Sequence, residues 1–153
     1  MIKILFICHG NICRSPMGEY ILKDLVERRG IAGAFQIASA AVSREEIGND
    51  VYPPARRCLL SHGVACPRRQ AVQLTAKDYE IYDRIFYMEE YNLAGIRRLL
   101  PGDPEGKVRR LLDAAARPRD VADPWYTGDF ETAYRDILEG CEAFLQSWEK
   151  THG

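Results

Sequence analysis

The sequence predicts an α/β protein: a three-layer α/β/α sandwich in which a four-stranded, parallel, twisted sheet carries helices on both faces. Two observations predict this fold. Short apolar segments of strand length alternate along the chain with longer segments of helical period, which is the pattern of parallel strands joined by crossover helices. The first segment, IKILFIC, has only one polar residue, as expected of a strand that is buried on both faces.

The strands and helices follow one another without repeats. The predicted strands are residues 2–8, 35–40, 83–88 and 107–113, and the arginines of the last suggest an edge position or a strand end. The predicted helices are residues 15–30, 52–63, 89–100 and 129–148. In the first helix, Ser15 is expected to cap, Pro16 to take the first helical position and Gly30 to end it. The last helix has apolar residues every three or four positions, which indicates an amphipathic helix.

Length and composition limit the function. A chain of 153 residues is expected to form a single domain over residues 1–153. A net charge of -1 argues against nucleic-acid binding, and no apolar segment has the length of a membrane span. The amino terminus lacks a signal-peptide pattern, so we expect a cytoplasmic protein, and a monomer. Five cysteines do not fit a disulfide framework and indicate reduced thiols used in catalysis, redox chemistry or metal binding.

The segment CHGNICRSP, residues 8–16, lies between the first strand and the first helix. Ligands of parallel sheets bind at the carboxyl ends of the strands, and loop N–H groups at a helix amino end hold anions. Gly10 gives this loop backbone freedom. A thiol in such a field loses its proton easily, so Cys8 is predicted to be a thiolate nucleophile, and Arg14 can hold two phosphate oxygens with its planar fork. The segment therefore predicts phosphoryl transfer through a covalent cysteine intermediate.

A proton donor is predicted in the segment ADPWYTGDF, near the carboxyl end of the chain. Asp123 precedes a proline, which favours an extended or turn conformation at the aspartate. Trp125 and Tyr126 could form apolar walls for a flat aromatic substrate. An Asp-Pro pair is usually only a turn, and Asp120 and Asp129 are the alternative donors.

The two segments together resemble the low-molecular-weight protein tyrosine phosphatase family. The resembling features are CHGNICRSP, with its Cys-x5-Arg-Ser spacing, and DPWY. The segments SAAVSREEIG, VYPPARRCL, AVQLTAKDY and FYMEEYNL extend the resemblance over nearly the whole chain. The resemblance implies a four-stranded parallel sheet and hydrolysis of phosphotyrosine in proteins, or of small aryl phosphates, through a phosphocysteine. It also implies binding of inhibitory phosphate or vanadate-like anions, and no metal or cofactor.

The resemblance also implies roles for single residues. Cys8 would be the nucleophile, Arg14 the residue that binds phosphate and the transition state, and Asp123 the general acid and then the base. Asn11 would brace the loop and Ser15 would donate a hydrogen bond to the Cys8 sulfur. The residues expected to contact phosphate or substrate are His9, Gly10, Asn11, Ile12, Cys13, Ser15, Trp125 and Tyr126. Cys13 would also be the backup thiol, and we expect it to form a reversible disulfide with Cys8 after oxidation.

Three positions depart from the family pattern. His9 follows the nucleophile where well-known members carry leucine or threonine, and we expect its ring to alter the shape of the pocket. Glu45 stands near the position of a wall aromatic in mammalian members, which predicts an acidic side of the cleft. Ile12 stands where the related arginine phosphatases carry threonine, which favours phosphotyrosine over phosphoarginine as the substrate.

Other interpretations use the same residues. Cys8 could be a buried strand residue, or Cys8, His9 and Cys13 could bind zinc, although no second ligand pair completes four ligands. An arsenate reductase would need further cysteines to relay a disulfide, and Cys66 has no evident partner in the sequence. A non-catalytic phosphate-binding module would not need both Cys8 and Asp123. The cysteines expected to be structural are Cys58, Cys66 and Cys141, and His62 is expected to cap a helix end.

Overall fold

The strands form one parallel sheet in the computed structural model, which describes residues 1–152. They are β1 (Ile2–Cys8), β2 (Phe35–Ala41), β3 (Arg84–Tyr87) and β4 (Val108–Arg110), in the order β2-β1-β3-β4. The helices are α1 (Arg14–Arg28), α2 (Pro53–Ser61), α3 (Ala76–Ile81), α4 (Glu90–Leu99), α5 (Pro124–Thr127) and α6 (Phe130–His152), with short 3₁₀ turns at Ala32–Ala34 and Leu111–Ala114. The predicted α/β fold is confirmed.

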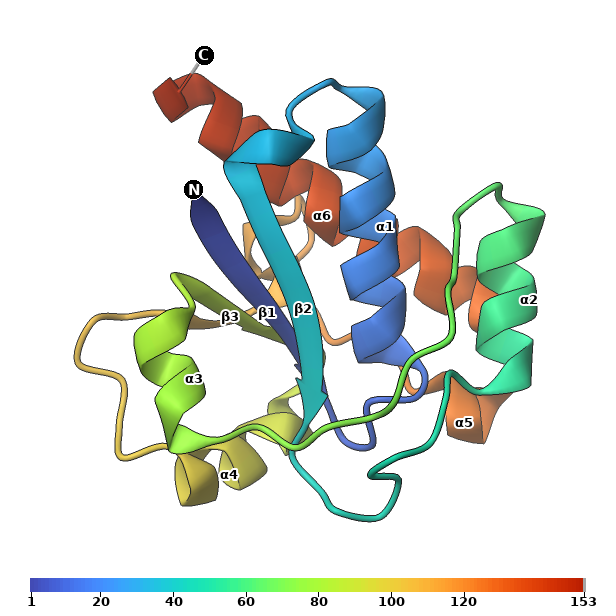
Figure 1. The fold of residues 1–153 in the computed structure, drawn as a ribbon, viewed down its shortest axis with the longest axis horizontal. Helices are drawn as coiled ribbons and strands as arrows, with labels where there is room; N and C mark the ends of the chain where they lie inside the picture. Colours follow the sequence, from blue (N-terminus) through green and yellow to red (C-terminus); the bar gives the residue numbers. More distant parts are fainter. Residues whose placement is uncertain (153) are drawn as a thin grey trace.

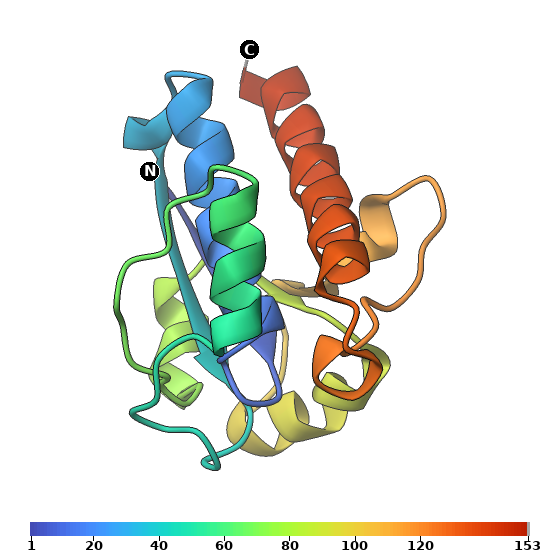
Figure 2. The same ribbon diagram turned by 90° about the vertical axis from the view of Figure 1, so that its right-hand side faces the viewer.

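Helices cover both faces of the sheet. Side chains alternate along β1, so that Ile4 and Phe6 pack with α1, α2 and α6, whereas Leu5 and Ile7 pack with α3 and α4. Figures 1 and 2 show these helices on opposite sides of the strands. This two-sided burial explains why the first strand reads as a continuous apolar run, and it makes the predicted three layers.

The first helix begins two residues earlier than the predicted cap at Ser15 and first helical position at Pro16 imply. Cys13 is the N-cap of α1 and makes no side-chain cap, so Ser15 is the second helical residue and Pro16 the third. The prediction that Ser15 caps the helix is therefore wrong. Its buried hydroxyl instead accepts a hydrogen bond from Asn11 Nδ2 at 2.7 Å, because the loop before the helix turns the asparagine side chain toward it.

The fourth strand is shorter than predicted. β4 pairs only with β3, at the predicted edge, and ends at Arg110. Leu111 and Leu112 follow in a 3₁₀ turn, and both are buried in the core below α6. Two consecutive side chains of a strand point to opposite faces, so the burial of both leucines on one side ends the strand.

Two short helices were not predicted. α3 begins with a reciprocal capping box between Thr75 and Asp78, and this Thr-x-x-Asp spacing is a signal that the sequence contains. α5 begins at Pro124, with Asp123 as its N-cap, and ends at Gly128, which has a φ of 74°. Asp123 itself is extended, as its position before proline predicted.

The chain places its loop 9–13 at the carboxyl end of the central strand β1. The connection through α1 leads to β2 on one side of β1, whereas β3 lies on the other side. Such a change of direction opens a crevice at the carboxyl ends of the strands. Within residues 1–152, none of the helices combines the length and the apolar character that crossing a membrane requires.

Candidate active site

A cavity of about 670 Å³ opens at this end of the sheet. Its lining includes most of the predicted site residues: Cys8, His9, Gly10, Ile12, Cys13, Arg14, Asp123, Trp125 and Tyr126. The other two predicted residues, Asn11 and Ser15, are fully buried behind the loop. The lining also contains Glu45, Glu46, Glu89 and Tyr91. Asp120 and Asp129, the alternative proton donors, do not line the cavity.

The backbone of the loop turns its carbonyl groups away from the cavity centre. The carbonyls of Cys8 and His9 accept hydrogen bonds from Val42 and Ser43, and those of Ile12 and Cys13 accept from Tyr52 and Met17. The peptide bonds of residues 1–152 are all trans, and in a trans peptide the N–H points opposite to the carbonyl of the preceding residue. The N–H groups that follow these carbonyls therefore point into the loop, where they can hold an anion.

Asn11 holds the loop in this shape. It is the residue with positive φ in the loop, at 58°, a region that asparagine tolerates better than most residues. Its Nδ2 donates to Ser15 Oγ at 2.7 Å and to Ser39 Oγ at 2.9 Å, and its Oδ1 accepts from Val72 N at 3.2 Å. Gly10 does not have positive φ; it gives space, because a Cβ there would lie 3.3 Å from Cγ of Glu46.

The Cys8 sulfur lies beside Ser15 at the floor of the cavity. Ser15 N donates to Sγ at 3.3 Å, and Ser15 Oγ is hydrogen-bonded to Sγ at 3.1 Å. Asn11 already donates to this hydroxyl oxygen, so the serine proton is free to point at the sulfur. Behind it, Ser39 Oγ accepts from Asn11 and donates to Glu19 Oε1 at 2.6 Å. The chain of hydrogen bonds from Glu19 thus orients a hydroxyl donor toward Cys8.

Arg14 is 1% exposed, and its guanidinium is held from three directions. Nη1 donates to the carbonyl of Val121 at 2.8 Å, while Nη2 donates to Glu89 Oε1 at 2.9 Å and lies 3.3 Å from Asp123 Oδ2. Burial by itself lowers the pKa of Arg14, but Cys8, Glu89 and Asp123 outweigh it and raise the pKa, so the residue is a fixed cation.

Sequence reasoning missed Glu89. Its side chain caps α4 as well as accepting from Arg14. Glu89 comes directly after the predicted strand 83–88, so its place at the carboxyl edge of the sheet is a signal that could have been used. No comparable signal marks Ser39 and Glu19, because strand and helix periodicity do not say which buried hydroxyl faces which loop.

Asp123 lies on the opposite wall from the loop. Its Oδ1 accepts from Trp125 N at 3.0 Å, which fixes the carboxylate and leaves Oδ2 near Arg14. Exposed rings line the same cavity: Trp125, Tyr126 and Tyr91 are 51%, 85% and 75% exposed. Large exposed aromatic side chains around a cavity mark a binding surface, and these three offer flat apolar faces to a ligand.

The remaining predicted residues lie as follows. His9 Nε2 is 3.1 Å from Glu45 Oε2 at the mouth of the cavity, so the imidazole is engaged by a carboxylate instead of by the two cysteines of the zinc alternative. Cys8 and Cys13 line the cavity, whereas the other three cysteines do not. Burial raises the pKa of the Cys13 thiol. All five cysteines are free, and the Cys8–Cys13 disulfide stays a prediction.

Comparisons with known proteins place this chain in a family. The family model for low molecular weight phosphotyrosine protein phosphatase matches residues 3–152. Low molecular weight protein-tyrosine-phosphatase YfkJ of Bacillus subtilis is 36% identical, over 98% of this chain and 97% of its own. The human low molecular weight phosphotyrosine protein phosphatase is 35% identical, over 98% of this chain and 96% of its own.

Solved structures extend the likeness to three dimensions. The crystal structure of YfkJ superimposes with a TM-score of 0.93 and covers 100% of this chain and 98% of its own, at 35% identity. Drosophila arginine phosphatase gives a TM-score of 0.88 at 30% identity, covering 96% of this chain and 98% of its own. Vibrio vulnificus Wzb, solved in complex with benzylphosphonate, gives a TM-score of 0.84 at 29% identity, covering 95% of this chain and 98% of its own. Because the family model spans almost every residue and relatives above 30% identity cover both chains almost completely, this chain belongs to the low molecular weight phosphotyrosine protein phosphatase family.

Proposed function

We propose that this protein hydrolyses phosphotyrosine in proteins, or small aryl phosphates, through a phosphocysteine on Cys8. The observation that carries the proposal is the convergence on one sulfur of the Ser15 hydroxyl and amide, with Arg14 and Asp123 at the same cavity. Inorganic phosphate and vanadate-like anions would bind as inhibitors in the same loop. The cytoplasmic location and the monomeric state predicted from the sequence belong to this proposal.

In the first step, Cys8 Sγ attacks phosphorus and the bond from phosphorus to the phenolic oxygen breaks. The inward N–H groups of the loop and the Arg14 guanidinium bind the three other oxygens and stabilise the charge that develops on them. Asp123 gives its proton to the leaving oxygen. Glu89 acts as a positioning residue in this scheme, since its carboxylate accepts a hydrogen bond from Arg14 Nη2 at 2.9 Å.

In the second step, a water attacks the phosphocysteine. Asp123, now ionised, accepts the proton of that water, and the phosphorus–sulfur bond breaks to release phosphate. The departing sulfur regains negative charge, and the Ser15 hydroxyl, whose oxygen lies 3.1 Å from it, can then donate to it. The step consumes one water and returns Cys8 and Asp123 to their initial states.

The cavity walls favour an aromatic leaving group. Trp125 packs against Tyr52 in a tilted arrangement, with ring centroids 4.7 Å apart and an angle of 52° between the planes, and with Tyr126 and Tyr91 it could enclose a phenyl ring. The benzylphosphonate held by Wzb is a ligand of this kind. Glu45 and Glu46 line the mouth and would favour basic residues near the phosphotyrosine. Phosphoarginine is the second candidate substrate because a relative at 30% identity is named an arginine phosphatase.

The first test separates catalysis from binding. Wild type and Cys8→Ser are compared for hydrolysis of 4-nitrophenyl phosphate, phosphotyrosine and phosphoarginine, and for phosphate binding by calorimetry. We expect Cys8→Ser to lose turnover and keep phosphate binding, because the loop amides and Arg14 do the holding. Faster hydrolysis of phosphoarginine than of phosphotyrosine would make phosphoarginine the substrate in place of phosphotyrosine. Equal loss of turnover and binding would contradict the division of roles.

A further inference from the structure

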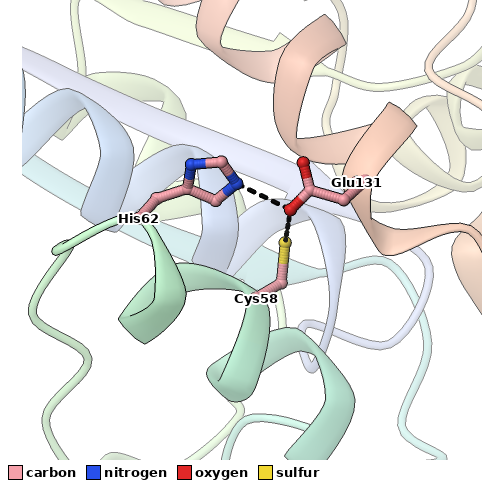
Figure 3. A group of neighbouring side chains, drawn as sticks. All are labelled: Cys58, His62 and Glu131. Atoms are coloured by element: carbon pink, nitrogen blue, oxygen red, sulfur yellow. Dashed lines mark hydrogen bonds and ion pairs between the residues drawn. The ribbon is translucent and has the colours of Figure 1, made fainter.

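A second cluster of metal-ligating side chains lies outside the cavity, between α2 and the amino end of α6. Cys58 and His62 are one helical turn apart, and Glu131 is in the first turn of α6. Their ligand atoms all lie within 4.8 Å of one another. Figure 3 shows both dashed contacts meeting at one carboxylate oxygen: His62 Nε2 to Glu131 Oε1 at 2.6 Å, and Cys58 Sγ to the same oxygen at 3.6 Å.

One of these separations already matches a tetrahedral zinc ion, and a second needs a small movement of an exposed side chain. With zinc–sulfur bonds of about 2.3 Å and zinc–nitrogen and zinc–oxygen bonds of about 2.0 to 2.2 Å, tetrahedral angles put sulfur and oxygen about 3.6 Å apart and nitrogen and oxygen about 3.4 Å apart. The sulfur–oxygen pair already has this spacing. The nitrogen–oxygen pair would have to open, and the Glu131 side chain is 48% exposed, so it can move outward at little cost.

The imidazole is held in a fixed direction. The ring of His62 stacks on the ring of Tyr134, with centroids 3.8 Å apart and an angle of 8° between the planes. Residue 62 is the C-cap of α2, as the sequence predicted, so the helix end carries the ring over α6. Support of this kind orients the ligands of metal sites and strengthens binding.

We propose that Cys58, His62 and Glu131 bind a zinc ion that ties α2 to the amino end of α6. A thiolate, an imidazole and a carboxylate form a mixed ligand set that suits zinc and does not suit magnesium or calcium, which prefer oxygen ligands alone. Three protein ligands leave a fourth position for water. The ion would be structural, because the cluster shares no residue with the lining of the active-site cavity.

Binding should release a proton. Zinc binds the thiolate, so the thiol proton leaves as the zinc–sulfur bond forms.

The ion would also stabilise the rim of the active site. Tyr52, the N-cap of α2, packs on Phe130 with ring centroids 6.0 Å apart, and Phe130 directly precedes Glu131. Tyr52 also contacts Trp125 of the cavity wall. A metal that binds only the folded protein stabilises it in proportion to the logarithm of the metal concentration, so we expect the melting temperature to rise with added zinc.

The test uses the full chain carrying Cys8→Ser, because the active-site thiolate could itself bind zinc. Zinc is titrated in competition with a chromogenic chelator, and cobalt is used as a spectroscopic probe of the ligands. We expect one zinc per chain, and with cobalt the charge-transfer absorption of a metal–thiolate bond. Adding His62→Gln or Glu131→Gln should weaken zinc binding by about tenfold or more, and Cys58→Ser should remove the thiolate absorption.

Matched controls are His152→Gln and Cys66→Ser in the same background, since both residues lie outside the cluster. These should bind zinc as the Cys8→Ser parent does. Circular dichroism in the presence of a chelator checks that each variant folds. The proposal is overturned if His62→Gln and His152→Gln bind zinc equally, if cobalt shows no thiolate band, or if the parent binds no zinc below millimolar concentration; in each case the cluster is only a surface ion pair.

Discussion

At the scale of single residues, Asp123 has two separate contacts that a substitution can tell apart. Oδ1 caps α5 by accepting from Trp125 N, whereas Oδ2 faces Arg14 in the cavity. Asparagine also caps helices well, but it has no proton to give to a leaving oxygen. Asp123→Asn therefore removes the proposed chemistry and preserves the local fold.

We predict that Asp123→Asn slows phenyl phosphate hydrolysis by about 10²- to 10⁴-fold. The rate of the first step with 4-nitrophenyl phosphate should fall less, because its leaving group departs without a proton. The measurement is kcat/KM for both substrates. An equal loss on both would mean that Asp123 acts only in positioning. The two alternative proton donors have other partners, since Asp120 pairs with Arg110 and Asp129 accepts hydrogen bonds from Thr132.

At the scale of elements, the loop between β1 and α1 depends on Asn11 for both its backbone and its hydrogen bonds. The asparagine combines a φ of 58° with three side-chain hydrogen bonds. Glycine accepts the same backbone conformation but has no side chain, and alanine provides neither property. The two substitutions therefore separate backbone strain from hydrogen bonding.

We predict that Asn11→Ala lowers the free energy of unfolding by about 2 to 4 kcal/mol, because three hydrogen bonds are lost and the backbone is strained. Asn11→Gly should cost about 1 kcal/mol less. Both should lower kcat, since Ser15 loses the donor that orients its hydroxyl. Urea unfolding and steady-state kinetics measure these effects. A glycine variant with wild-type kcat would show that the loop keeps its shape without the asparagine.

The elements also show how far the sequence is informative. Buried strands and amphipathic helices follow from side-chain periodicity, so β1, α2, α4 and α6 lie close to their predicted positions. The position of Cys8 and Arg14 directly after a buried strand predicted where the cavity lies, because ligands of a parallel sheet bind at the carboxyl ends of its strands. The Arg14–Glu89 and Asn11–Ser39 contacts could not be predicted, since they depend on which strands are neighbours and on helix rotation, which local patterns do not contain.

At the scale of the whole molecule, glycines on α1 and α6 let these two helices pack closely against the rest of the core. A Cβ on Gly18 of α1 would lie 2.7 Å from the Phe6 ring of β1, and one on Gly140 of α6 would lie 2.5 Å from Cγ of Leu111. Both distances are too short, so either helix would have to move away. Of these two helices, α1 carries active-site residues, namely Arg14 and Ser15, whereas α6 carries none of the residues that line the cavity.

We predict that Gly18→Ala and Gly140→Ala each destabilise the fold by about 1 to 3 kcal/mol. Gly18→Ala should also lower kcat, because α1 moves Arg14 and Ser15 away from Cys8 on β1. Gly140→Ala should leave kcat nearly unchanged. Thermal unfolding and kinetics of the two variants measure the contrast. Equal effects on kcat would show that the distance between α1 and β1 does not control the site.

The central claim, that Cys8 carries the phosphoryl group, is tested most directly by trapping it. The Asp123→Asn variant is mixed with 4-nitrophenyl phosphate, because loss of the general base slows hydrolysis of the intermediate more than its formation. The reaction is quenched within the first turnover, and the modified peptide is mapped by mass spectrometry. The account predicts one phosphoryl group per chain on Cys8 and none when Cys8→Ser is added. A phosphoryl group on His9 or Ser15, or product formation with no labelled chain, would contradict it.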